Sequence, residues 1–171
     1  MTKNKTLTFF CGLVTEFFFY SLIGWLYETI LTSIAWGEFA KRGFLHLPFL
    51  PIYGFIGLFL VMLLAKLKSI PVIFLAGTAI TTVAELAASY LIDIFLNKPL
   101  WNYSHWDFNF EGRISLYSSL IFGLLCVLLL KLLHPMMKKI NEKISGIPLY
   151  LTALTLLLAI FTDLIITITL K

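Results

Sequence analysis

Long runs of apolar residues constrain this chain more than any other feature. Hydrophobic residues make up 60% of its 171 residues and charged residues only 13%, against roughly 25% charged in an average soluble domain. About 20 consecutive apolar residues suffice for a helix to cross a bilayer. The pattern therefore predicts an all-α, polytopic membrane helix bundle that forms one domain over 1–171, with spans at about 8–36, 47–66, 71–96, 113–134 and 147–170.

Proline residues mark the expected helix ends. Pro48 and Pro51 precede or open the second span, Pro71 the third and Pro148 the fifth, because proline in a first turn removes an N–H that has no helical partner. Pro135 is expected to end the fourth span, since a proline inside a helix clashes with the preceding turn. The segment that follows, MMKKINEKIS, is basic and amphipathic, which suits an anionic membrane surface.

The distribution of Lys and Arg predicts the orientation, because cytoplasmic connections carry an excess of these residues. Eight fall on one side of the predicted bundle: Lys3, Lys5, Lys66, Lys68, Lys131, Lys138, Lys139 and Lys143. Five fall on the other: Lys41, Arg42, Lys98, Arg113 and Lys171. This excess places the N-terminus in the cytoplasm and the C-terminus outside, across the cytoplasmic membrane.

Polar residues recur every three or four positions along three spans, so that each set shares one helix face. The first span carries Gly12, Glu16, Tyr20, Gly24, Glu28 and Thr32, and the third carries Gly77, Thr81, Glu85, Ser89 and Asp93. The fifth carries Thr152, Thr155, Ala159, Thr162, Ile166 and Thr169, with Asp163 beside them. Small residues on such a face permit close helix packing. Carboxylates inside a span are costly and usually face the bundle interior or a cavity. Because most of them fall in the outer halves of the spans, we expect a polar cavity that faces the extracytoplasmic side.

The connection WNYSHWDFNFEGRIS, residues 101–115, combines aromatic, charged and glycine residues in an otherwise apolar chain. Such a stretch survives at membrane depth only where protein or a cavity surrounds it. We therefore expect it to fold toward the bundle and cap the cavity. Spans one and two, like spans three and four, also read as a helix with Glu, an aromatic loop, an Arg and a helix, which suggests a faint internal repeat.

Three stretches carry a resemblance to a known family: GWLYET (24–29), KRGFLHLPFLPIYG (41–54) and WNYSHWDFNFEGRISL (101–116). They resemble the type IV ABC-transporter permease family of small bacterial membrane proteins, over about residues 20–135. The family pattern is matched at Gly24, Trp25, Glu28, Arg42, Gly43, Pro48, Pro51, Tyr53, Gly54, Glu85, Trp101, Tyr103, Ser104, Asn109, Gly112 and Arg113. The chain departs from it at Asn102, where Asp is usual, and at Glu111, where Asn is usual.

The resemblance implies an integral membrane transport component, a permease. The sequence contains no G-x-x-x-x-G-K-[ST] phosphate loop, so that the chain cannot itself hydrolyse ATP. The expected partners are membrane lipids with a separate ATPase subunit or further copies of the chain, without nucleic acid or a cofactor. A non-catalytic assembly or regulatory subunit, and a membrane enzyme acting on a lipid-linked substrate, remain open as alternatives. Against the enzyme, no nucleophile and base stand at a recognisable spacing.

No catalytic or metal-binding set is predicted, but nine residues are candidates for substrate binding: Glu28, Arg42, Tyr53, Glu85, Asp93, Trp101, Tyr103, Asn109 and Arg113. Arg113 could pair with a carboxylate of the third span or bind a carboxylate or phosphate of a substrate. It cannot lose its charge, so a buried Arg113 needs an acceptor. We expect it within salt-bridge distance of Glu28, Glu85 or Asp93.

Overall fold

The helices begin and end where the sequence supplies caps. In the computed structural model, which describes residues 4–97, 99 and 101–169, α1 (Lys5–Trp36) starts after Asn4, whose side chain accepts a hydrogen bond from the Leu7 N–H. It ends at Gly37, which takes the left-handed conformation (φ 74°) that glycine adopts at no steric cost. α3 (Ile70–Leu96) ends in the same way at Asn97.

The remaining elements follow in chain order. A short helix α2 (Pro51–Leu64) precedes α3, and the hairpin strands β1 (Asn109–Phe110) and β2 (Ile114–Ser115) follow it. α4 (Leu116–Leu128) continues through a π-helical segment η1 (Leu129–Leu133) into α5 (His134–Lys143), and α6 (Ile147–Thr169) comes last. The predicted all-α architecture of about five apolar helices is confirmed.

Four stretches are long and apolar enough to cross a membrane: Lys5–Trp36, Ile70–Phe95, Leu116–Lys143 and Ile147–Thr169. The chain is therefore a multi-pass membrane protein. The second predicted span, 47–66, is shorter than expected, because residues 43–48 are bends and the helix begins only at Pro51. Its 14 residues measure about 21 Å at 1.5 Å per residue, less than a bilayer core of about 30 Å.

The expected end of the fourth span at Pro135 is wrong. The helical path runs on through Pro135 to Lys143. Proline clashes with the carbonyl four residues earlier in a regular α-helix, here that of Lys131. Lys131 lies inside η1, and the wider π turn changes the hydrogen-bond pattern at that position. The π segment therefore accommodates the proline within a continuous helix.

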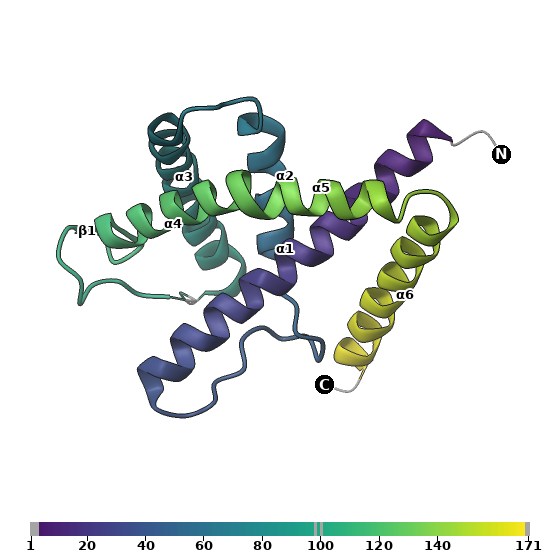
Figure 1. The fold of residues 1–171 in the computed structure, drawn as a ribbon. Coiled ribbons are helices and arrows are strands. Elements are labelled where there is room, and N and C mark those ends of the chain that lie inside the picture. Colours follow the sequence, from purple (N-terminus) through teal and green to yellow (C-terminus); the bar gives the residue numbers. More distant parts are fainter. Residues whose placement is uncertain (1–3, 98, 100, 170–171) are drawn as a thin grey trace. The chain divides into compact units, whose positions relative to one another are not determined.

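The chain divides into two units, which are described separately. Unit 1 comprises Met1–Phe59 and His134–Lys171, and unit 2 comprises Leu60–Leu133. In unit 1, α1 packs against α6 and α5 (Figure 1). Two glycines of α2 permit its close approach to α1: a Cβ at Gly54 would collide with Ser21 and Phe17, and one at Gly57 with Tyr20. The polar stripe of α1 is thus a packed face, which carries Glu16, Tyr20 and Ser21 in its buried part.

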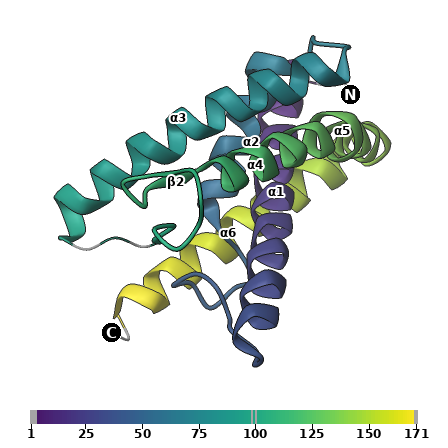
Figure 2. The ribbon, with the colours of Figure 1, turned by 90° about the vertical axis from the view of Figure 1, so that its left-hand side faces the viewer.

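Unit 2 is built on the pairing of α3 with α4, which lie side by side with the connection, residues 101–115, at one end (Figure 2). A Cβ at Gly77 would lie 2.6 Å from the Cβ and Sγ of Cys126, and one at Gly123 would collide with the Thr78 hydroxyl. The small residues of the α3 stripe therefore face α4. Of the charges that predict orientation, Lys3, Lys98 and Lys171 lie outside the described residues.

Candidate functional site

Glu85 lies at the centre of the α3 stripe and is held by hydroxyl groups. The Tyr103 hydroxyl donates to its Oε1 (2.9 Å), and the Ser118 hydroxyl lies 3.3 Å from its Oε2. Among the described residues, no Lys, Arg or His nitrogen lies within 4.0 Å of this carboxylate. An apolar helix thus carries a carboxylate that is hydrogen-bonded but has no adjacent cation.

The contacts of Glu85 reveal how far the connection reaches along α3. Ser118 belongs to the first turn of α4, and Tyr103 belongs to the connection. Both meet Glu85, which precedes Asp93 by two helical turns, about 12 Å along the axis. The connection therefore folds back along α3 by about that length before α4 begins. The predicted folding of this loop toward the helices is confirmed.

Arg113 provides a cation near the C-terminal end of α3. Its guanidinium forms an ion pair with Asp93 (2.5 Å) and a longer one with Glu111 (3.3 Å), and it lies over the ring of Tyr90. The expected ion pair of Arg113 is thus confirmed, with Asp93 as its partner. The guanidinium donates a hydrogen bond to Asp93, which raises the pKa of Arg113. The charged form of the guanidinium is therefore favoured beside Asp93.

The turns of the connection are closed by its own polar side chains. The Asn109 side chain donates to the Trp106 carbonyl and accepts from the Gly112 N–H. Gly112 is left-handed (φ 67°), and a Cβ there would lie 2.6 Å from the Asn102 side chain. Asn102 accepts from the Ser104 N–H (2.8 Å), a bond that an aspartate oxygen would also accept. The departure from the family residue at position 102 therefore leaves this turn intact.

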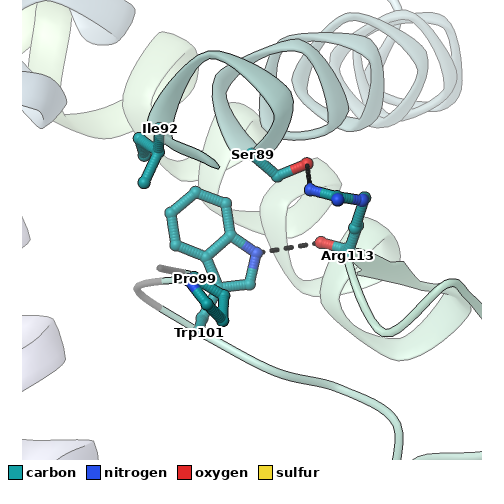
Figure 3. A pocket seen from close by; sticks show the side chains of 5 residues that line it. All are labelled: Ser89, Ile92, Pro99, Trp101 and Arg113. Carbon is teal, nitrogen blue, oxygen red and sulfur yellow. Dashed lines mark hydrogen bonds between the residues drawn. The ribbon is translucent and has the colours of Figure 1, made fainter. Parts of the chain in front are cut away.

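A small pocket lies between the end of α3 and the connection (Figure 3). Its walls are Ser89, Ile92, Pro99, Trp101 and Arg113. The Trp101 indole donates to the Arg113 carbonyl (2.9 Å), and the Arg113 guanidinium reaches the Ser89 hydroxyl (3.4 Å). The cavity volume is about 20 Å³, enough for roughly one water molecule. A larger molecule could enter only if the connection moved.

Unit 1 contains a second cluster of candidate residues, around Glu28 of α1. Arg42 donates through its Nε to Glu28 Oε2 (3.0 Å), and the Tyr53 hydroxyl donates to Oε1 (2.8 Å). The Trp25 indole donates to the Arg42 carbonyl (3.0 Å). The Tyr53 ring occupies the space in which a Cβ of Gly24 would stand. Gly24 therefore admits the ring that orients Glu28.

The nine candidate residues thus gather in two groups. Glu28, Arg42 and Tyr53 lie together in unit 1. The others lie in unit 2, in or beside the α3 connection: Glu85, Asp93, Trp101, Tyr103, Asn109 and Arg113. Their role in binding stays a prediction, as does a single cavity shared by both groups. Within unit 2, the geometry assigns Asn109 to the turn itself.

Two further polar clusters of unit 1 were not among the candidates. Asp163 of α6, which is buried, accepts from the backbone N–H groups of His46 and Leu47 and so holds the bend before α2. Glu16, Tyr20 and His134 form the other cluster. Glu16 and Tyr20 stand on the predicted stripe, but His134 is 118 positions beyond Glu16. No local spacing signal joins residues so far apart.

Comparison with known proteins agrees with the membrane architecture. The model of the family described as "Putative ABC-transporter type IV" matches residues 15–168. No curated protein and no solved structure matches the chain. The match extends well beyond the three quoted stretches and includes α6, which the motifs alone did not reach. The chain therefore belongs to the ABC-transporter type IV family.

Proposed function

We propose that the chain is the membrane-embedded component of a transport system for a small charged or polar solute. It lies in the cytoplasmic membrane with its N-terminus in the cytoplasm, and its polar site faces the extracytoplasmic side. The observation that carries this proposal is Glu85, a carboxylate on an apolar helix whose contacts are the hydroxyls of Tyr103 and Ser118. Ionisable residues within membrane spans commonly mark solute and ion pathways.

The surroundings of Glu85 support this function. A structural seam needs only small residues, and the α3–α4 seam already has them at Gly77 and Gly123. A carboxylate adds nothing to such packing and is costly in a lipid environment. Asp93 lies two turns away on the same stripe, and Arg113 of the connection is paired with it. A solute that carries both a cationic and an anionic group would find an acceptor at Glu85 and a donor at Arg113.

The energy source lies outside this chain in the proposed system. Its sequence has no phosphate-binding loop for ATP, whereas the family name refers to ATP-driven transport. We therefore propose a separate ATPase subunit as the partner. A further copy of the chain is the alternative partner. The chain is purified while all other subunits remain untagged and at their natural levels, and it is then crosslinked. The mass of the crosslinked product distinguishes an ATPase subunit from a second copy of the chain.

Solute binding tests the proposal directly. The chain in lipid nanodiscs is incubated with a metabolite extract and washed, and bound molecules are identified by native mass spectrometry. We expect a small molecule that is retained by the natural chain and lost from Glu85→Gln and Arg113→Lys, because lysine lacks the planar fork of arginine. The matched control is Asp107→Asn in the same connection, where the side chain is exposed, and it should retain the molecule.

Two results would overturn the proposal. One is that the natural chain retains no solute although its folded state is verified by its thermal unfolding. The other is that a solute is retained equally by the natural chain, Glu85→Gln and Arg113→Lys. A chemically altered solute in the bound fraction, again dependent on Glu85, would replace transport with an enzymatic function.

A further inference from the structure

A second ionisable cluster lies within unit 1, where Glu16 and Tyr20 of the α1 stripe meet His134. Glu16 Oε2 accepts from the Tyr20 hydroxyl (2.9 Å) and lies 3.1 Å from His134 Nδ1. The Tyr20 hydroxyl and His134 Nδ1 are 3.2 Å apart, so that the three groups close a triangle. Tyr20 is 3% exposed and Glu16 8%. Glu16 and Tyr20 are therefore buried even without a surrounding bilayer, whereas the His134 side chain is 22% exposed.

The charge of this cluster depends on one proton. With Glu16 ionised and His134 neutral, the cluster carries one negative charge in a buried site, which is strongly unfavourable unless compensated. One added proton makes it neutral overall, whether that proton resides on the imidazole or on the carboxylate. The Tyr20 hydroxyl donates to Glu16 and can stabilise the negative charge only in part. The geometry is therefore that of a site for a single proton.

Among the described residues, no other charged side chain forms an ion pair with Glu16 or His134. On α5, Lys138, Lys139, Glu142 and Lys143 are exposed. On α6, the Tyr150 hydroxyl bonds to Thr8, and Asp163 is occupied by the bend before α2. On α1 the next carboxylate, Glu28, is already held by Arg42 and Tyr53. Within the part of the chain that the structure describes, Glu16 and His134 thus pair with each other alone.

Polar groups extend from this cluster toward the N-terminal end of α1. Directly before Glu16, the Thr15 hydroxyl contacts the Asn141 side chain (2.8 Å) and the Gly12 carbonyl (2.8 Å). About two turns from Glu16, the Thr8 and Tyr150 hydroxyls are 2.8 Å apart. Glu16 lies eleven residues beyond Lys5, about 17 Å along the helix. Groups that can donate and accept protons therefore line the face between that end and Glu16.

The helix that carries His134 is irregular next to this residue. The π-helical segment Leu129–Leu133 directly precedes His134 in sequence. Single π turns inside α-helices are rare and occur frequently at functional positions. The irregularity thus adjoins the one residue of the cluster that α1 does not provide.

We propose that Glu16 and His134 form a proton-binding site that Tyr20 orients, and that the site gains and loses one proton during the transport cycle. The proton comes from water at the N-terminal end of α1, and its uptake changes the net charge of the pair from minus one to zero. The proton site exists independently of the proposed function, but its part in a transport cycle rests on that function. Glu28, twelve residues along the same helix, lies about 18 Å from it.

Infrared difference spectroscopy during a pH titration of the chain in nanodiscs tests the site. We expect a protonation signal from carboxylate or imidazole groups that is lost in Glu16→Gln and altered in His134→Gln. Tyr20→Phe should keep the signal but change its band position, because one hydrogen bond to Glu16 disappears. Glu142→Gln is the matched control: it removes an exposed carboxylate of α5 and should leave the buried signal unchanged.

The outcome separates this site from the proposed function. A signal that persists in Glu16→Gln and in His134→Gln, with both variants folded as judged by thermal unfolding, overturns the proton site. If either variant fails to fold, Tyr20→Phe decides: loss of its hydrogen bond to Glu16 must shift the protonation band, and an unshifted band overturns the site. Solute retention without the proton signal leaves transport intact and removes this site. A proton signal without solute retention keeps the proton site and contradicts the transport function.

Discussion

At the residue scale, two arginines are fixed in the same manner. The Trp25 indole donates to the Arg42 carbonyl, and the Trp101 indole donates to the Arg113 carbonyl. Each guanidinium in turn meets a carboxylate of the preceding long helix, Glu28 or Asp93. Both the backbone and the charged end of each arginine are therefore held. The faint sequence repeat thus has a counterpart in the hydrogen bonds, although Trp25 is helical and Trp101 belongs to a connection.

Removing one hydroxyl tests whether Glu85 fastens the connection to α3. Tyr103→Phe deletes the donor to Glu85 Oε1, and hydrogen bonds to charged groups contribute roughly 1.5–3 kcal/mol. We expect the free energy of unfolding to fall by about that amount, measured by denaturant titration in detergent micelles.

A double-mutant cycle assigns that loss to the pair. In a Glu85→Leu background, Tyr103→Phe should have almost no further effect, because its acceptor is already absent. Equal losses in both backgrounds would show that the Tyr103 hydroxyl acts elsewhere, and the account of the connection would then be wrong.

At the element scale, small residues decide which helices pair. In unit 2, Gly77 and Gly123 bring α3 and α4 so close that Cβ atoms at these positions would collide with Cys126 and Thr78. Close approach replaces the hydrophobic driving force, which is absent between helices in lipid. The face of α3 that carries Glu85 is thereby turned toward α4 and its first turn.

Gly123→Ala should disturb this pairing in a way that a second change repairs. The new methyl group collides with the Thr78 hydroxyl, and overpacking typically costs about 1–3 kcal/mol. Thr78→Ala removes that oxygen and should restore part of the lost unfolding free energy. Gly12→Ala is the control, since its methyl group would lie 3.5 Å from Asn141. Full stability of the single variant would contradict the close α3–α4 contact.

The elements also show what the sequence could predict. Apolar run length and proline positions placed α1, α3 and α6 within a few residues, because burial in lipid requires those runs. The continuation of the helix through Pro135 could not be predicted, since a π turn has no simple sequence signal. The Arg113–Asp93 pair was one of the three ion pairs expected for Arg113, and the structure selects it. The Glu16–His134 pair needed tertiary structure, because no periodicity connects α1 with α5.

At the scale of the whole molecule, the short helix α2 determines the topology. Four stretches are long enough to span, and α2 reaches only about 21 Å. The residues before it, 43–50, are ordered by Asp163 and by the Leu50 N–H bond to the Ser21 carbonyl. Together with this non-helical segment, α2 can still cross the bilayer, because protein rather than lipid satisfies its backbone.

Cysteine labelling decides between five crossings and four. If α2 crosses, residues 4 and 105 lie on opposite sides, as the excess of Lys and Arg predicts for an inward N-terminus. Asn4→Cys should then react with an impermeant thiol reagent only in inverted vesicles, and His105→Cys only in intact cells. Reaction of both from one side would contradict the proposed topology and leave α2 as a re-entrant helix.

The most direct test of the central claim, a polar site on α3 that opens to the outside, is labelling at Ser89. This residue is buried beside Arg113 in the small pocket. In a chain whose Cys11 and Cys126 are replaced by Ala, Ser89→Cys should react slowly with a small impermeant thiol reagent added to intact cells. Ser104→Cys, which is exposed on the same connection, should react rapidly and serves as the control. Reaction of position 89 only from the cytoplasmic side, or no reaction while position 104 is fully labelled, would contradict the account.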